Sequence, residues 1–191
     1  MRIVPIVEGH GDAQALRVLL PRIVAEMPGA PYLEVLHPIR VRRQKILKEG
    51  ELERTLDLAA RQTARDDGIL ILLDADSDCP YELSRRLLAR AATARADRRV
   101  RAVFPKRMYE AWFLAAAPSI AGHRELDVGL IAPADPESNP NPKAWLTERM
   151  PPGRSYRETL DQAAFTATFD LRAACASPSF RKLCRDIASL F

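Results

Sequence analysis

The stretch Gly68-Ile69-Leu70-Ile71-Leu72-Leu73-Asp74-Ala75-Asp76-Ser77-Asp78 decides the fold. Five consecutive aliphatic residues lead into three carboxylates at alternate positions. An apolar run of this length is typical of a strand buried on both faces, as in a parallel sheet. Ligands bind where such strands end, because the loops at the carboxyl edge diverge and leave a crevice. If extended backbone persists through Asp76, alternation places Asp74 and Asp76 on the same side.

Strand and helix patterns alternate around this run. Strands are expected over residues 2–7, over 32–39, over the apolar run itself and over 100–105. One helix is expected to follow the turn after the first strand and to end near Met27, a second to span 50–66, and a third to begin at Pro80. This order predicts an α/β fold, a parallel sheet of about four strands flanked by helices. Pro5 argues that the first strand is an edge strand or a strand start. Asp78 is placed to cap the helix that begins at Pro80.

After Lys106 the pattern changes to short helical segments separated by a proline-containing loop over 118–142. Helical patterns appear at 109–117, 143–150, 161–169 and 179–190. We therefore expect an α/β domain over 1–117 and a mostly helical C-terminal extension over 118–191, packed together as one structural unit. Trp112 and Trp145, at helical positions, are expected in the core rather than as platforms for stacked bases.

The composition is that of an ordinary soluble protein, with 47% hydrophobic and 28% charged residues. No apolar run approaches the roughly 20 residues of a membrane helix, and no signal-peptide pattern opens the chain. The cysteines are odd in number and form no CxxC pair, which favours a reducing compartment. With only three scattered histidines, a zinc site is not expected. A cytoplasmic protein without membrane contact is the expectation.

Basic residues are concentrated in two stretches. Five lie between Arg40 and Lys48 with no acidic residue, and nine lie between Ser84 and Arg107 beside one acid, Asp97. Basic surfaces attract polyanions, although arginines on solvated helix faces would give the same composition. The residues expected to contact nucleic acid are Arg40, Arg42, Arg43, Lys45, Lys106 and Arg107.

Acidic residues follow two of the expected strands. Glu8 closes the first strand, and Asp74 and Asp76 close a later one, so all three meet at one edge if these strands are neighbours. Carboxylates held that close require a proton or a cation, and Mg²⁺ or Mn²⁺ suits oxygen ligands. Asp12 lies one helical turn beyond Glu8, where it is either a ligand or an acid favoured by the helix dipole.

The turn between Glu8 and Asp12 contains two glycines. Gly9 and Gly11 allow backbone to approach a phosphate, and the following helix start presents N–H groups to an anion. Carboxylates, a glycine-bearing turn and nearby basic residues are what metal-assisted phosphoryl transfer needs.

The motifs resemble those of the Toprim domain. Val7-Glu8-Gly9 after a first strand, with Leu73-Asp74-Ala75-Asp76 after a later one, is similar to its glutamate-plus-DxD pairing, and the form Glu8-Gly-His-Gly-Asp12 resembles its nuclease branch, which includes the OLD-family nucleases. Tyr109–Leu114, Lys143–Leu146 and Ser177–Lys182 also resemble a bacterial family of stand-alone Toprim-like proteins of unknown function.

The resemblance implies a set of roles. Its expected metal ligands are Glu8, Asp12, Asp74, Asp76 and Glu110, and its expected catalytic residues are Glu8 and Lys143. Lys143 resembles the lysine that supports the transition state or the attacking water in OLD-type nucleases; a solvent-exposed lysine that opens a helix is the alternative. The chain lacks the tyrosine-bearing domain of topoisomerases, the zinc module of primases and a GxxxxGK[ST] loop, so any ATPase would be a separate partner.

Two functions from different classes follow. The first is a Mg²⁺-dependent nuclease, with DNA favoured over RNA, serving bacterial defence or DNA repair as the resemblance implies. The second is a non-catalytic, metal-stabilised subunit that binds nucleic acid or regulates a partner. Nucleotidyl transfer of the primase kind is disfavoured because accessory domains are missing. The sequence is compatible with a homo-oligomer.

Overall fold

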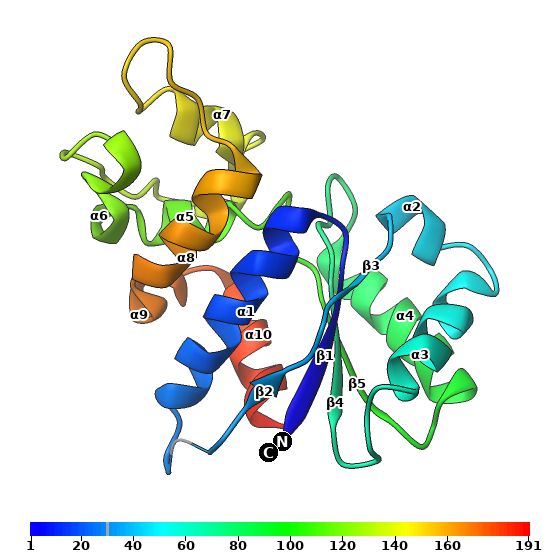
Figure 1. Ribbon diagram of the computed structural model, residues 1–191. Coiled ribbons are helices and arrows are strands. Elements are labelled where there is room, and N and C mark those ends of the chain that lie inside the picture. Colours follow the sequence, from blue (N-terminus) through cyan, green and yellow to red (C-terminus); the bar gives the residue numbers. More distant parts are fainter. Residues whose placement is uncertain (30) are drawn as a thin grey trace.

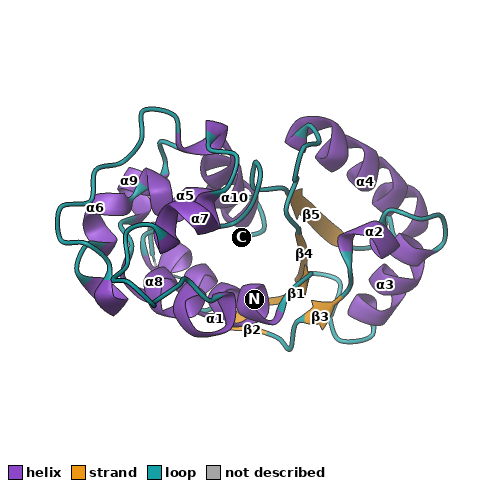
Figure 2. Cartoon of the chain, turned by 90° about the horizontal axis from the view of Figure 1, so that it is seen from above, coloured by secondary structure: helices purple, strands orange, loops and turns teal. Residues whose placement is uncertain are grey.

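A parallel sheet with helices on both faces forms the body of the protein (Figures 1 and 2). The computed structural model describes residues 1–29 and 31–191. The strand order is β2-β1-β4-β5, and β3 also pairs with β1, on the same side as β2. The strands are β1 (Arg2–Val7), β2 (Glu34–Val35), β3 (Ile39–Arg40), β4 (Gly68–Leu72) and β5 (Arg99–Val103). All their pairings are parallel, which confirms the predicted α/β class.

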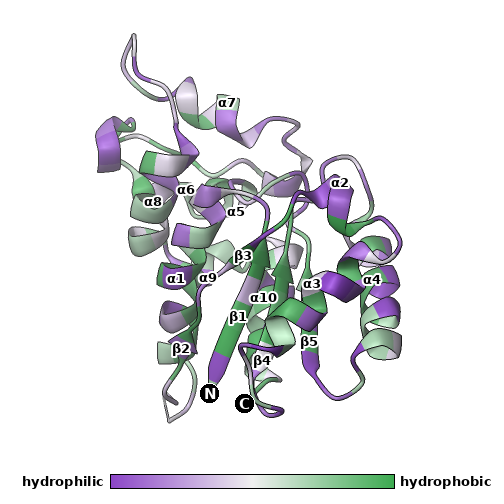
Figure 3. Cartoon of the chain, turned by 45° about the vertical axis from the view of Figure 1, so that its right-hand side comes forward, coloured by the Kyte–Doolittle hydropathy of each residue, from purple (hydrophilic) through white to green (hydrophobic). Residues whose placement is uncertain are grey.

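The apolar run 69–73 supplies the central strand β4, which is buried along its whole length. Leu70 and Leu72 point into the core on the α1 side, whereas Ile69 and Ile71 point into the core on the α3 and α4 side. This is the two-sided burial that a continuous aliphatic run predicts. Figure 3 shows the central strands of the sheet largely in green, the colour of hydrophobic residues.

The expectation that Pro5 marks an edge strand or a strand start is wrong, because Pro5 lies inside β1, between β4 and the short strands β2 and β3. The carbonyl groups of Ile3 and Val7 accept hydrogen bonds from the Leu36 and Val41 N–H groups. Pro5 lies midway between them and faces the same way by alternation. Its missing N–H group therefore falls in the gap between β2 and β3.

The single strand expected over residues 32–39 forms two short pieces instead. β2 pairs with the start of β1 and β3 pairs with its end. Pro38 stands just before β3 and, like Pro5, has no N–H group to donate. The N–H group that Pro5 lacks on this side of β1 explains why the ladder is interrupted there.

The main helices flank the sheet as the periodicity predicts. They are α1 (His10–Ala25), α2 (Arg43–Ile46), α3 (Glu51–Ala60) and α4 (Pro80–Ala94). The helix expected over 50–66 ends at Ala60. The expectation that Asp78 caps α4 is wrong. The N-cap position is Cys79, and Asp78 pairs with Arg43 instead.

The C-terminal region is mostly helical and shares its core with the sheet. Its helices are α5 (Ala111–Ala115), α6 (Ala117–Ile120), α7 (Pro142–Thr147), α8 (Ala163–Thr168), α9 (Leu171–Ala174) and α10 (Pro178–Ala188), with the short turns η1 (His123–Glu125), η2 (Pro136–Ser138) and the π-helical η3 (Glu158–Gln162). α10 contacts both α1 and β5. One hydrophobic cluster contains Ile3, Leu70, Trp112, Trp145 and Leu190, which confirms the two tryptophans as core residues.

None of the described helices combines the length and the apolar character that crossing a membrane requires.

Candidate metal and nucleic-acid site

The carboxyl ends of the strands meet at one edge, uppermost in Figure 1. Across this edge, in the spatial order β3, β1, β4 and β5, the chain places Arg40, Glu8, Asp74 and Lys106 at or just after the strand ends. Acidic residues thus follow the two central strands, and basic residues stand at the strands on either side. The sequence left open whether the strand bearing Glu8 neighbours the strand before Asp74, and the pairing of β1 with β4 shows that it does.

Asp74 is half-buried at the end of β4. Its Oδ1 accepts a hydrogen bond from the Tyr109 N–H at 2.9 Å. Burial, and then the carboxylates of Glu110 and Asp12, raise the pKa of Asp74 well above its usual range, while Lys143 and the Tyr109 N–H oppose the shift. The charged form of Asp74 is therefore short of positive compensation.

Glu110 stands immediately before α5 and is only 1% exposed. Its Oε1 accepts a hydrogen bond from the Tyr156 hydroxyl at 2.9 Å and lies 4.0 Å from the Lys143 ammonium. Burial raises the pKa of Glu110, and the nearby Lys143 charge lowers it in part. Two neighbouring carboxyls, Asp74 and Glu110, are thus held in surroundings that disfavour their ionisation.

Asp12 takes the helix-terminal role that was one of its two predicted roles, and its role as a metal ligand stays a prediction. In the first turn of α1, its Oδ2 accepts a hydrogen bond from the Gly9 N–H at 3.0 Å, as a helix-capping acid does. Its Oδ1 accepts another from the Gln162 side-chain amide at 2.8 Å, and its charge acts on Asp74. Asp12 therefore caps the helix and also belongs to the acidic cluster, which we define as Asp12, Asp74 and Glu110.

Lys143 lies near the start of α7, and its side chain is 34% exposed. Its ammonium makes a close ion pair with Glu158 Oε1 and a longer one, at 4.0 Å, with Glu110 Oε1. Lys143 does open a helix, as the alternative reading held, but its ammonium faces the acidic cluster instead of standing alone in solvent.

Asp76 does not share a side with Asp74. β4 ends at Leu72, and Asp76 adopts a positive φ of 52°, so the alternation of an extended strand does not reach it. The Asp76 N–H donates to the Arg107 carbonyl, and its side chain, 62% exposed, lies 3.5 Å from Arg43. Arg43 also pairs with Asp78, so this arginine holds the loop after β4.

Glu8 is exposed at the end of β1, and its side chain makes no hydrogen bond or ion pair with the other described residues. Within residues 1–29 and 31–191, no three His, Cys, Asp or Glu side chains lie close enough together to hold a metal ion. The acidic cluster nevertheless has the chemistry of a hard-cation site, since its donors are carboxylate oxygens short of positive charge. Gln162 adds a buried side-chain oxygen that has no hydrogen-bond partner among the described residues.

A family model described as "Domain of unknown function (DUF4276)" matches residues 7–188. The chain belongs to this family. No curated protein and no solved structure matches it. The DUF4276 description assigns no reaction.

The predicted basic contacts in this DUF4276 chain fall into two groups. Arg40, Arg42 and Lys106 are exposed and form no ion pair with the described residues. Lys45 pairs with Glu51 at 3.5 Å, and Arg43 is held by Asp76 and Asp78. Arg107 is half-buried, and within the described part of the chain its Nε has no hydrogen-bond partner. The exposed group remains available to a polyanion.

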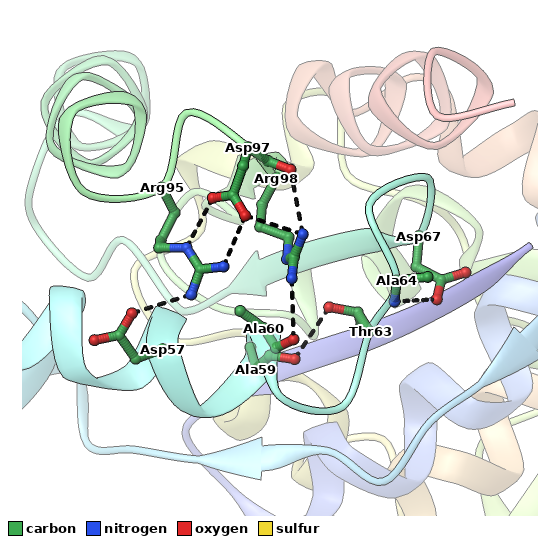
Figure 4. A network of polar contacts seen from close by, with 9 residues as sticks. All are labelled: Asp57, Ala59, Ala60, Thr63, Ala64, Asp67, Arg95, Asp97 and Arg98. Atoms are coloured by element: carbon green, nitrogen blue, oxygen red, sulfur yellow. Dashed lines mark hydrogen bonds and ion pairs between the residues drawn. The ribbon is translucent and has the colours of Figure 1, made fainter.

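Much of the basic run over 84–107 serves the fold. Figure 4 shows Arg95 bonded to Asp57 and Asp97, and Arg98 bonded to Asp97 and the Ala60 carbonyl. Arg90 likewise pairs with Glu53. These arginines therefore fit the alternative to polyanion binding, in which arginines lie on helix surfaces and at helix ends.

Three contributors to the site were missed by the sequence analysis: Tyr156, Glu158 and Gln162. The last two lie on η3, which packs against the start of α1. A Cβ on Gly11 would overlap the Gln162 amide oxygen and lie 3.0 Å from Glu158 Cβ. Gly11 thus lets η3 approach α1, and the phosphate-binding role expected of the turn stays a prediction. The only signal in the sequence for this contact is Gly11 itself, because a glycine allows another segment to approach the backbone closely.

Proposed function

We propose that this protein is a Mg²⁺- or Mn²⁺-dependent nuclease of the Toprim type that hydrolyses phosphodiester bonds, with DNA favoured over RNA. The observation that carries the proposal is the acidic cluster, where burial and mutual repulsion raise the pKa values of Asp74 and Glu110 at the carboxyl edge of a parallel sheet. Such a cluster would be relieved by a divalent cation. The Toprim motifs after β1 and β4 support the same reading.

In this proposal Asp74 and Glu110 hold the cation, together with Asp12 and, after local rearrangement, Glu8 and Asp76. The chemistry supplied by a bound cation would be Lewis-acid polarisation of a phosphoryl oxygen. Lys143, whose ammonium already faces Glu110, offsets negative charge that builds on the phosphate. Glu8 is exposed and lacks a partner among the described residues, so it can take either of its two proposed roles, as a ligand of the cation or as the acceptor of a proton from the attacking water.

The exposed basic residues would position the nucleic acid. Arg40 and Arg42 lie beyond β1 on one side of the acids, and Lys106 lies after β5 on the other. Phosphates on either side of the scissile bond could thus be held while the bond itself lies over the acids. A separate ATPase partner and a role in bacterial defence or DNA repair belong to this proposal through the Toprim resemblance.

The test is cleavage of supercoiled plasmid and of single-stranded DNA and RNA by purified full-length protein in Mg²⁺ or Mn²⁺. Asp74→Asn and Glu110→Gln are expected to lower the rate about 100-fold or more. Glu82→Gln, on the exposed face of α4 where Glu82 pairs with Arg85, is the matched control and should cleave normally. Cleavage at the wild-type rate in both site variants would identify a contaminant and refute the enzyme proposal.

A second candidate is a metal-stabilised nucleic-acid-binding or regulatory subunit without catalysis. The observation in its favour is that Glu8 and Asp76 stand apart from Asp74, so the DxD pair does not act on one cation as arranged. Binding that weakens with salt, with no cleavage in either metal, would select this candidate.

A further inference from the structure

The loop after β5 carries an arginine that the described residues leave without a partner. Arg107 is half-buried, its Nε is shielded from solvent, and its guanidinium makes no hydrogen bond or ion pair within residues 1–29 and 31–191. A partly buried charged donor that stays unpaired costs free energy, which a ligand with acceptor oxygens can recover. A guanidinium suits phosphate oxygens in particular, because its planar fork of N–H groups can donate to two of them at once.

Arg107 is fixed beside the loop that carries the acids. The Asp76 N–H donates to the Arg107 carbonyl at 3.0 Å, which forms an isolated antiparallel bridge between the loop after β4 and the loop after β5. Lys106, the preceding residue, is exposed and forms no ion pair with the described residues. Two consecutive basic residues therefore stand next to the loop that begins at Asp74.

An exposed aromatic side chain lies on the same flank of the site. α4 packs against β5 (Figure 2), and the Ser84 hydroxyl donates to the Ala102 carbonyl of β5 at 2.8 Å. Tyr81 precedes Ser84 by three residues, so it lies about one helical turn nearer to the end of β5, where Lys106 and Arg107 follow. Tyr81 is 69% exposed. An exposed ring beside basic residues is the arrangement that binds a single nucleic-acid strand, because an unpaired base stacks on the ring while the charges hold the phosphates.

The acids of the site are recessed relative to this flank. Glu110 is 1% exposed and Asp74 is half-buried, whereas Tyr81 and Lys106 are exposed. A duplex is stiff and keeps its phosphates on a regular outer surface. A single strand can bend, so that one phosphodiester enters the recess while the neighbouring nucleotides stay on the flank. The depth of the acids therefore favours a single strand over a duplex.

We propose that the β5 flank, which we define as Tyr81, Lys106 and Arg107, binds single-stranded DNA, with an unpaired base stacked on Tyr81 and the adjoining phosphate held by Arg107. The inference rests on the proposed function, because it names the form of nucleic acid that the same site takes.

The experiment is fluorescence anisotropy of a short end-labelled DNA, either single-stranded or annealed to its complement, titrated with full-length protein in EDTA. The wild type should bind the single strand roughly tenfold more tightly than the duplex. Tyr81→Ala should weaken single-strand binding roughly tenfold, whereas Tyr81→Phe, which keeps the ring, should bind as the wild type does.

Tyr32→Ala is the matched control for the loss of an exposed ring. Tyr32 is 78% exposed but lies at the opposite end of the sheet, where its carbonyl accepts a hydrogen bond from the Met1 amino group. This variant should bind the single strand with wild-type affinity.

The salt dependence of binding separates the phosphate contact from the stacking contact. Arg107→Met should weaken single-strand binding and reduce the slope of log K against log salt by about 0.7, because one fewer phosphate is neutralised. Tyr81→Ala should leave this slope unchanged, because stacking on an uncharged ring releases no counterions.

The outcomes separate the inference from the proposed function. If the duplex binds as tightly as the single strand, or if Tyr81→Ala or Arg107→Met binds the single strand as the wild type does, the inference is overturned. Because EDTA removes divalent cations, cleavage plays no part in these measurements. A protein that shows the expected binding pattern but cleaves nothing in Mg²⁺ or Mn²⁺ would refute the nuclease proposal and support the inference.

Discussion

At the scale of the residue, Asp74 and Glu110 are two carboxyl groups whose surroundings disfavour the charged form. Both have raised pKa values, chiefly through burial, and Lys143 compensates them only in part. Their neighbours Tyr109 and Tyr156 are also held in their neutral form, because burial and the nearby acids raise the pKa of each hydroxyl. Carboxylates kept in such surroundings lower stability when they ionise, which is typical of sites kept for binding.

The free energy of unfolding is expected to depend on pH through these two groups. In the unfolded chain their pKa values return to about 4, so between that pH and the raised native values the folded protein binds more protons. Stability therefore falls as pH rises through this window. Thermal unfolding in EDTA from about pH 4 to pH 8 should show a shallower fall for Glu110→Gln than for wild type, and Mg²⁺ should restore stability at the upper end.

Glu82→Gln serves as the control for that pH series, because Glu82 is an exposed residue that pairs with Arg85 on the surface of α4. A Glu110→Gln profile parallel to the wild-type profile would show that Glu110 does not titrate abnormally in the folded protein.

At the scale of the element, the site depends on a π-helical turn pressed against a helix start. η3 contacts α1, and the contact closes over the glycine turn that follows β1. Arg43, on α2, plays the corresponding part on the other side, where it holds the loop after β4 through Asp76 and Asp78. Short elements far apart in the sequence thus fix the two loops that carry the acids.

Gly11→Ala is expected to destabilise the protein by about 1–3 kcal/mol, because the new methyl group would overlap the Gln162 amide and force η3 away from α1. Gly129→Ala is the control: a Cβ there would meet only Asp127 Oδ1, at an ordinary 3.6 Å. Urea unfolding of both variants measures the difference. Equal stability of the two would mean that η3 yields without cost and that Gly11 serves another purpose.

At the scale of the whole molecule, one edge of the sheet gathers the acids, with exposed basic residues on both sides. The packing of the whole molecule also decides which basic side chains can contact a ligand. Arg42 and Lys106 are exposed, whereas Arg43 pairs with Asp76 and Asp78. Nucleic-acid affinity should therefore depend unequally on neighbouring arginines.

Arg42→Met and Lys106→Met should each weaken DNA binding at every sequence tested and reduce the slope of log K against log salt by about 1. Arg43→Met should leave that slope unchanged, because its charge is neutralised within the protein, and should instead lower stability by about 1–3 kcal/mol. Fluorescence anisotropy over a salt series, with urea unfolding beside it, separates the two effects. A slope that falls only in Arg43→Met would reverse the assignment.

The sequence by itself determined the sheet and the location of its acids. A continuous aliphatic run must be buried on both faces, and parallel strands must end at one edge, so Glu8 and Asp74 were expected at that edge; the pairing of β1 with β4 then makes their strands neighbours. Local pattern also placed Trp112 in the core and α1, α3 and α4 beside the sheet.

Only the tertiary structure decided which side chains complete the cluster. Gln162 bonds to Asp12 across 150 residues, and Glu158 meets Lys143 from a turn with no distinctive motif. Asp76 points away from Asp74 because its backbone takes a positive φ and its side chain pairs with Arg43 on α2, 33 residues earlier in the chain. Periodicity reports which face of its own element a residue occupies; it carries no information about which distant element packs there, and that packing decides the site.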